Sequence, residues 1–296
     1  MKRLGAGRGS AMLRDVTPGI LAGGQGTRLR PITNVKRPKP FLKLFSNQSL
    51  LQDTVLRSRP MGDPVVIVHR DYAERARADL DALGAGGHVI CEPAGRSTAP
   101  AIALAALLLR DENKPMLIMP SDHYIHDPAQ FHSAAALAYE ALKSGSSGAA
   151  ILGVPARAPD ARYGYIQIDE GGNVRRFIEK PDRPLAKDLI ADGRCFWNTG
   201  MFMMRPRDYL AALKKFEPDI YDLCLRCFEG GRHEKSFLFV KSDIYSKIKG
   251  LAVDHAIMER LPSAGRKIHL AVLHGYWQDV GCFSALIRAK VKSLIN

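Results

Sequence analysis

The sequence predicts an α/β fold in which a mainly parallel, mixed central sheet is flanked by helices and followed by a portion rich in β-hairpins. Up to about Val154, short apolar runs alternate with helical patterns, as in successive βαβ units. Beyond Val154, strand-like runs separated by glycine turns replace that alternation. A chain of 296 residues can bury one large core. We therefore expect a single domain over residues 15–296, after a basic, glycine-rich, flexible leader over residues 1–14.

The elements of the first part follow one another at short intervals. Strands are expected near residues 17–21, 65–68, 89–91, 116–119 and 149–154, and helices near residues 49–58, 72–83, 99–110 and 128–143. Ligands of parallel sheets bind beyond the carboxyl ends of the strands. The segments that directly follow these strands are therefore the candidate binding segments.

The second part has a different organisation. Residues 163–168 and 174–181 predict a hairpin around the turn at residues 170–173. Helices are expected over residues 207–216 and 218–228, and an amphipathic helix with late basic residues is expected over residues 282–296.

Charge and composition narrow the class of partner. The net charge is +13, from 43 Lys and Arg against 30 Asp and Glu, and an excess of this sign favours anionic ligands. The basic residues are scattered and not interleaved with aromatic ones, so small phosphorylated ligands are favoured over nucleic acid. No apolar run is long enough to span a bilayer, and we expect no membrane partner.

The cysteines indicate a reducing compartment. Five widely spaced cysteines, an odd number, predict free thiols and a cytoplasmic protein. Cys224 and Cys227 form a lone C-x-x-C on a helical pattern. Two core thiols are favoured there over a metal site, because no second pair of ligands follows.

The loop after the first predicted strand is the most informative stretch of the chain. Ile20 to Pro31 reads I-L-A-G-G-Q-G-T-R-L-R-P, and P-K-P follows at residues 38–40. The spacing fits neither the P-loop nor the dinucleotide-binding fingerprint. A tight turn would need one or two glycines but no neighbouring cations. Three glycines with Arg28 and Lys39 close by therefore favour an anion site that suits a triphosphate.

The segment after the fourth predicted strand carries a candidate metal ligand. Asp122 follows the apolar run of residues 116–119, and Mg²⁺ prefers one or two carboxylates together with phosphate oxygens. The alternative role of a helix N-cap fits Asp127 better, because Pro128 comes directly after it. A serine-hydrolase site at Ser121 and His123 is disfavoured, because no nucleophile elbow is present.

These motifs resemble those of a known superfamily. G-G-x-G-T-R-L-x-P followed by P-K-P is similar to the N-terminal motif of the sugar-1-phosphate nucleotidyltransferases. The resemblance implies a Rossmannoid, GT-A-like fold with its nucleotide-binding part near residues 15–154 and its sugar-binding part near residues 155–296. It also implies that Arg28 faces the departing pyrophosphate and that Lys39 neutralises phosphate charge. The implied nucleotide-binding residues of this loop are Leu21, Ala22, Gly23, Gly24, Gly26, Thr27 and Arg28.

A second string indicates the base. Glu92 to Ile102 reads E-P-A-G-R-S-T-A-P-A-I and resembles the loop of mannose-1-phosphate guanylyltransferases that faces guanine, with Ser97 in place of the usual Asn. A helix cap at Thr98 explains part of the string without any ligand. The resemblance adds Glu92, Arg96, Thr98, Ala99 and Ser121 to the nucleotide-binding set.

Further strings lie on the expected sugar side. Y-G-Y-I, F-x-E-K-P, W-N-T-G-M-F and an element like S-I-D-Y-A-V-M-E occur in order. On the residues alone, Glu179 and Lys180 are about equally well explained as a surface ion pair. The resemblance makes sugar-phosphate ligands of Tyr163, Gly164, Glu179, Lys180, Asn198 and Asp254. Asp279 in Y-W-Q-D-V-G matches the second metal ligand beside Asp122.

The sequence therefore predicts a Mg²⁺-dependent nucleotidyltransferase that makes GDP-mannose and pyrophosphate from GTP and mannose 1-phosphate. Its catalytic residues would be Arg28, Lys39, Asp122 and Asp279. A thymidylyl- or uridylyltransferase acting on glucose 1-phosphate remains an alternative, as does a regulatory subunit that binds nucleotide-sugars without turnover. A homo-oligomer is left open.

Overall fold

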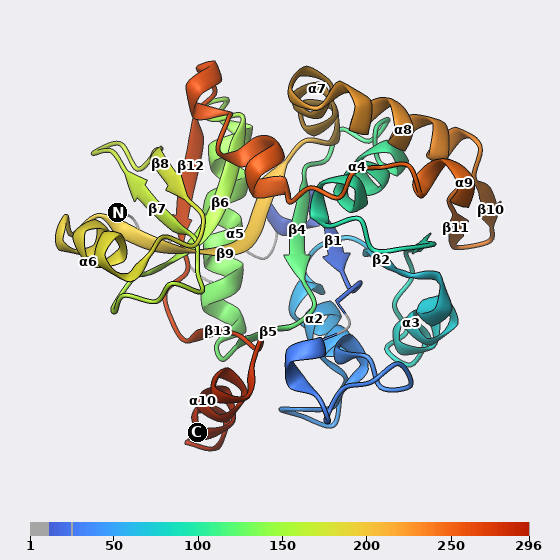
Figure 1. Cartoon of the computed structure of the whole chain (residues 1–296), viewed down its shortest axis with the longest axis horizontal. Coiled ribbons are helices and arrows are strands. Elements are labelled where there is room, and N and C mark those ends of the chain that lie inside the picture. The colour runs from blue at the N-terminus through green and yellow to red at the C-terminus, as the bar shows by residue number, and fades with distance from the viewer. Residues whose placement is uncertain (1–11, 25, 296) are drawn as a thin grey trace.

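The computed structural model describes residues 12–24 and 26–295 and contains one large mixed sheet with helices on both faces (Figure 1). The strand order is β10-β11-β3-β2-β1-β4-β9-β6-β12, and the β7–β8 hairpin attaches to β9; β5 and β13 form a separate pair. The strands are β1 (Thr17–Leu21), β2 (Val65–His69), β3 (His88–Glu92), β4 (Met116–Pro120), β5 (His123–Ile125), β6 (Ala149–Pro155), β7 (Tyr165–Ile168), β8 (Val174–Ile178), β9 (Cys195–Met204), β10 (Arg232–Glu234), β11 (Phe237–Phe239), β12 (Ile268–Val272) and β13 (Trp277–Asp279).

The helices connect these strands and cover the sheet. They are α2 (Leu50–Ser58), α3 (Ala73–Asp81), α4 (Thr98–Leu108), α5 (Pro128–Lys143), α6 (Arg183–Ala191), α7 (Pro206–Phe216), α8 (Pro218–Glu229), α9 (Ser242–Tyr245) and α10 (Phe283–Leu294). Short 3-10 turns lie at Leu13–Asp15, Thr27–Leu29, Lys39–Phe41, Arg70–Tyr72 and Pro262–Ala264, and a π-helical turn spans Asp254–Met258.

The strands and helices expected before Val154 are confirmed to within a few residues. Local signals explain the helix starts. Asp127 caps α5 by accepting from the backbone N–H of Ala129 at 2.9 Å, with Pro128 at the first helical position, as the sequence predicted. Ser49 and Gln52 form a reciprocal capping box at the start of α2.

Strand β9 is the main element that sequence reasoning did not predict. It runs antiparallel between β4 and β6, whereas β1 pairs in parallel with both β2 and β4. The N-terminal half of β9 also pairs with β7 and so attaches the predicted β7–β8 hairpin to the main sheet. The sheet is therefore mixed and mainly parallel, and one long strand joins its two parts.

Two apolar layers lie on opposite faces of the sheet. Side chains of successive strand residues alternate between them: Val65 and Ile67 of β2 pack in the cluster that contains α4, α7 and α8, and Val66 and Val68 pack in the cluster that contains α5. Helix α4 is buried almost all round, which explains its run of alanine and leucine. Cys224 and Cys227 are fully buried in α8, so the prediction of two core thiols is confirmed.

The prediction of a flexible leader over residues 1–14 is wrong for its last residues. Residues 1–11 lie outside the described residues. Leu13, however, is fully buried in the core within the turn Leu13–Asp15, so the folded part begins before Asp15. Among the described helices, none has the length and apolar character needed to cross a membrane.

Candidate functional site

The glycine loop leaves the carboxyl end of β1 and brings Lys39 next to it. Gly26 has φ +68°, and a Cβ placed there would lie 2.8 Å from Cβ of Lys39 and 3.1 Å from Cγ2 of Thr33. Both the backbone conformation and the close contact therefore require glycine. The Thr33 hydroxyl donates to the Gly26 carbonyl at 2.7 Å and fixes the loop against the segment that leads to Lys39.

Lys39 lies between the two predicted metal ligands. Its side chain is almost completely buried, and its ammonium forms an ion pair with Asp122 and lies 4.0 Å from Oδ1 of Asp279. Burial opposes ionisation of Asp122, but the charge of Lys39 and its bond to this carboxylate outweigh the effect of burial, and the pKa of this carboxyl is lower than usual. The sequence assigned Lys39 to phosphate; in this structure its direct partners are carboxylates.

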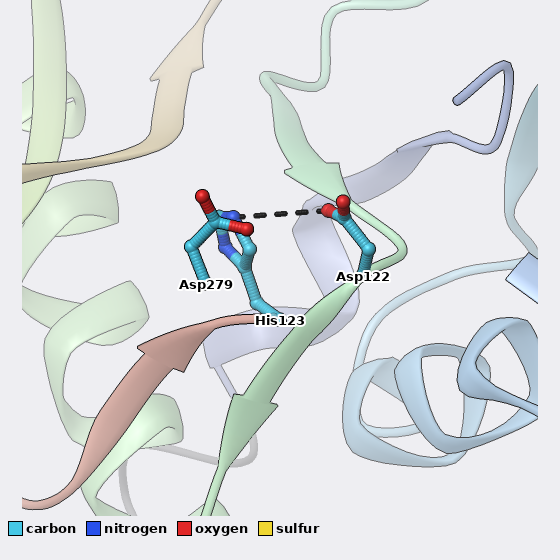
Figure 2. A group of neighbouring side chains, drawn as sticks. All are labelled: Asp122, His123 and Asp279. Atoms are coloured by element: carbon cyan, nitrogen blue, oxygen red, sulfur yellow. Dashed lines mark ion pairs between the residues drawn. The ribbon is translucent and has the colours of Figure 1, made fainter. Parts of the chain in front are cut away.

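A small antiparallel pair of strands brings Asp279 to Asp122. Asp279 at the end of β13 is paired in register with His123 at the start of β5, and the Val280 N–H donates to the Asp122 carbonyl at 3.3 Å. Figure 2 shows the side chains of Asp279 and His123 side by side, with Asp122 facing them. The sequence brought the two aspartates together only through the family resemblance; the β5–β13 pair supplies the physical reason.

His123 is a member of this group that the sequence analysis did not assign. One atom from each of Asp122, His123 and Asp279 lies within 4.8 Å of the others, a spacing that suits a metal site. The Trp277 indole donates to Nδ1 of His123 at 3.3 Å, so a neutral ring carries its proton on Nε2, which lies 3.8 Å from Asp122. Burial lowers the pKa of His123 and favours this neutral form. The protonated Nε2 of His123 therefore lies on the side of Asp122, and the two aspartates are the oxygen ligands suited to a divalent cation.

A cavity of about 410 Å³ opens beside the glycine loop. The predicted metal ligand Asp122 lines it, as do seven predicted nucleotide-binding residues: Leu21, Gly23, Gly24, Glu92, Arg96, Thr98 and Ser121. Ala22 and Ala99 do not line it: their side chains are buried, and their N–H groups donate to the carbonyls of Ile67 and Leu251. Gly26 and Thr27 lie outside its lining as well, and Arg28 lines a second cavity.

Glu92 is a buried carboxyl in this cavity. Its Oε1 accepts from the Tyr245 hydroxyl, and its Oε2 lies 3.5 Å from the position of a Cβ on Gly23. Burial raises the pKa of Glu92 to about 7, although the Tyr245 hydrogen bond opposes this shift. Tyr245 comes from α9, which the sequence analysis did not expect, and no sequence signal linked it to Glu92.

The loop after Glu92 differs from the sequence-based interpretation. Helix α4 begins at Thr98, and its N-cap position is Ser97, so Thr98 is not the cap. The Thr98 hydroxyl accepts from the Val253 N–H at 2.8 Å, and Arg96 donates to the Ser246 carbonyl. Ser97 adopts φ +65° and ψ −168°, a region that residues with a side chain rarely occupy.

A second cavity, of about 210 Å³, lies on the other side of Pro120, which lines both cavities. All six predicted sugar-phosphate ligands line it: Tyr163, Gly164, Glu179, Lys180, Asn198 and Asp254. Arg28 and Asp279 line it too. A Cβ on Gly164 would lie 2.5 Å from Oε2 of Glu179 and 3.2 Å from Cβ of Asn198, so glycine lets these side chains approach the cavity.

Polar side chains inside the second cavity bond to one another. Asn198 donates to Asp254 at 3.0 Å and accepts from the Gly200 N–H at 2.8 Å. Glu179 forms an ion pair with Lys180. Burial, together with the nearby charge of Glu179, raises the pKa of Asp254 to about 6. Such a set offers both acceptors and a cation to a polyhydroxylated anion.

Three residues in or beside this cavity make contacts there that the sequence analysis did not assign. Arg162 and Cys282 line it, and Arg162 is paired with Asp160 and donates to Sγ of Cys282 at 3.3 Å. Gln278 is buried beside it and donates to the Tyr163 hydroxyl at 2.6 Å. The only sequence signal for these three residues is that they lie close in the chain to Tyr163 or Asp279, which the sequence analysis did assign.

Comparisons with known proteins agree with this arrangement. A family model described as nucleotidyl transferase matches residues 18–295. The xanthan biosynthesis protein XanB of Xanthomonas campestris pv. campestris is 38% identical over 283 residues, which cover 93% of this chain and 59% of that protein. A mannose-1-phosphate guanylyltransferase of Klebsiella pneumoniae is 37% identical over 282 residues, covering 91% and 59%. The chain thus spans less than two thirds of the length of these relatives.

Among solved structures, one from Thermus thermophilus, described as a mannose-1-phosphate geranyltransferase, superposes with a TM-score of 0.78 at 28% identity. The match covers 93% of this chain and 79% of that one. The predicted Rossmannoid, GT-A-like architecture is thereby confirmed. From the match of the family model over nearly the whole chain, we conclude that this protein belongs to the nucleotidyl transferase family.

Proposed function

We propose that this protein transfers a guanylyl group from GTP to mannose 1-phosphate and releases pyrophosphate. A phosphate oxygen of the sugar phosphate forms a bond to the α-phosphorus of GTP as the bond between the α- and β-phosphates breaks. The electron pair of the broken bond leaves with the pyrophosphate. The attacking oxygen is already an anion, so the reaction needs positioning and charge neutralisation more than a strong base.

The main support for this proposal is that the two cavities lie on either side of one cluster of charged residues, formed by Lys39, Asp122 and Asp279. Asp122 lines the larger cavity and Asp279 lines the smaller one, and the Lys39 ammonium bonds the first and lies near the second. A triphosphate in the larger cavity and a sugar phosphate in the smaller one would approach each other at this group. That is the arrangement an in-line displacement requires.

The chain supplies cations for the charge that gathers there. Arg28 lines the smaller cavity, and its Nη2 lies 3.1 Å from the position of a Cβ on Gly281. Lys180 lines the same cavity and is well exposed. Two anionic substrates repel each other, and these cations at the smaller cavity offset this repulsion.

We infer that Asp122 and Asp279 hold Mg²⁺ during the reaction. Two neighbouring carboxylates already share one buried cation, the Lys39 ammonium, and carboxylate oxygens suit Mg²⁺ better than nitrogen or sulfur ligands do. When bound, the ion would neutralise phosphate charge. Asp122→Asn or Asp279→Asn should abolish metal-dependent turnover; full activity of either variant, or wild-type activity in saturating EDTA, would refute this assignment.

The choice of base and sugar rests on residues and relatives together. Glu92 and the turn that follows it supply acceptors to the larger cavity, and guanine presents an N–H donor edge. Asn198, Asp254 and Glu179 offer acceptors for sugar hydroxyls in the smaller cavity. A relative that aligns over most of this chain is named mannose-1-phosphate guanylyltransferase.

We also infer a reducing, cytoplasmic setting, because the described cysteines are all free thiols. A homo-oligomer stays a prediction.

The test is pyrophosphate release over a matrix of four nucleoside triphosphates and several sugar 1-phosphates. GTP with mannose 1-phosphate should exceed every other pair in kcat/KM, by about two orders of magnitude over UTP or dTTP. A preference for dTTP or UTP with glucose 1-phosphate would replace the assignment, and no turnover with any pair would favour a regulatory, non-catalytic role.

A further inference from the structure

Helix α10 carries a stripe of exposed apolar side chains. We name Phe283, Ile287, Val291 and Leu294 the α10 stripe; their exposed fractions are 40%, 61%, 52% and 82%. Spacings of four, four and three residues place them on one side of the helix. Ile295 directly after it is exposed as well, and Val35 is the only other large apolar side chain with such exposure in the described part of the chain.

The opposite side of α10 is also apolar. Ala285, Leu286 and Ala289 are buried against the rest of the protein. A helix that is apolar on both sides is normally covered on both sides. Figure 1 shows α10 at the edge of the molecule beyond β13, where no other described element covers the outer side.

The charges beside the stripe all have one sign. On a helical projection Lys290 lies directly beside the stripe on one side, Arg288 lies on the other side, and Lys292 lies further round on the side of Arg288, toward the buried side of the helix. Helix α10 itself contains no Asp or Glu. Cations on both sides of an apolar stripe are typical of helices that lie in the interface of an anionic membrane.

A second copy of the chain is a poorer partner for this surface. Val35 offers too little apolar area elsewhere, so apolar contact between copies would require α10 to pack on α10. That contact would bring Arg288 and Lys290 of both copies to one seam with no acidic residue from either helix. Negative charge on the partner removes this repulsion.

We propose that the α10 stripe, with Arg288, Lys290 and Lys292, docks the protein on an anionic lipid surface. The apolar side chains enter the boundary between headgroups and acyl chains, and the cations contact lipid phosphates. This revises the expectation of no membrane partner, which considered only membrane-spanning runs. The proposal does not depend on the reaction proposed above.

The test is cosedimentation of the full chain with vesicles of phosphatidylcholine alone and of an equimolar mixture with phosphatidylglycerol. Binding is expected only to the anionic mixture and should weaken as salt is raised. Lys290→Glu with Lys292→Glu should lower the partition coefficient roughly thirtyfold or more, since each cation near such a surface contributes about fivefold. Ile287→Ser with Leu294→Ser should lower it at least about tenfold.

Two control variants are matched to these changes. Arg175→Glu with Arg176→Glu changes the net charge equally at two exposed residues of β8, and Val35→Ser removes an exposed apolar side chain elsewhere. Both should bind vesicles like the wild type. Light scattering without lipid measures the mass of each variant, and circular dichroism checks its fold.

Three results would overturn the proposal. One is a wild-type protein that sediments with neither vesicle. Another is an equal loss of binding in the control variants. The third is a lipid-free dimer that Ile287→Ser with Leu294→Ser converts to a monomer while vesicle binding is absent, which would make a second copy the partner of α10.

Discussion

Replacing Lys39 by methionine should expose the electrostatic design of the site. The methionine side chain fills nearly the same volume but leaves Asp122 and Asp279 without their shared cation. Removing one partner of a fully buried ion pair costs about 3–5 kcal/mol. The two carboxylates are 29% and 33% exposed, so solvent screens part of their repulsion. We therefore expect the low end, about 3 kcal/mol of unfolding free energy.

The loss of unfolding free energy in Lys39→Met should depend on the concentration of divalent metal. In the wild type, Mg²⁺ competes with an ammonium already bound to Asp122, whereas in Lys39→Met it meets two unpaired carboxylates. Mg²⁺ should therefore bind the variant more tightly and restore much of the lost stability, by mass action on the folded state. The wild type should be stabilised less.

The assay is thermal unfolding of both proteins in EDTA and over a series of Mg²⁺ concentrations, with calorimetric titration for affinity. For a chain of this size, about 3 kcal/mol corresponds to a fall in Tm of roughly 6 °C in EDTA. Lys180→Met, at a well exposed lysine, serves as the control and should unfold like the wild type. Equal Tm values for Lys39→Met and wild type in EDTA, with the same response to Mg²⁺, would refute the reasoning.

Three further predictions concern single residues. Burial raises the pKa of Glu92 from the usual 4.5 to about 7, so the folded state binds more protons and wild-type stability should fall as pH rises through this window; Glu92→Gln should lose that fall and be more stable at pH 8 by roughly 3 kcal/mol in urea unfolding. Gly26→Ala should destabilise the fold by about 1–3 kcal/mol and lower kcat, because its Cβ meets Lys39 in a left-handed backbone region. Gln278→Leu leaves the Tyr163 hydroxyl without its donor and should raise KM for the sugar phosphate more than it lowers kcat in steady-state assays.

The βαβ part of the fold could be predicted because its signals are local. Strands such as β2 are continuous apolar runs, and α5 begins at an Asp-Pro cap, so short windows of sequence suffice. Strand β9 could not be found this way. Its N-terminal half lies beside the second cavity and carries polar residues such as Asn198, which hide the strand pattern until β6 and β7 provide its partners.

The sequence predicted many residues of the site, but it did not predict the contacts that bring them together. The sequence located Asp122 after a strand, but only the β5–β13 pairing explains why Asp279 lies beside it. Long-range contacts of this kind leave no mark at either position. The same holds for Glu92, whose partner Tyr245 is 153 residues away in the chain.

Lys39 shows why the missing information matters for function. Read from the sequence, it is a cation near a phosphate loop, and any exposed lysine would serve. In the structure its ammonium is buried, bonds Asp122 and lies 4.0 Å from Oδ1 of Asp279, and these are the carboxylates that suit a divalent ion. Without a metal ion, the two close carboxylates repel each other, and the ammonium beside them offsets this repulsion. When a metal ion and phosphates bind beside these carboxylates, we expect the same ammonium to add to the positive charge that faces the phosphate oxygens. One lysine can therefore stabilise the free enzyme and neutralise charge in the reaction. To separate these two roles, the unfolding of Lys39→Met and of the wild type must be measured both with and without Mg²⁺.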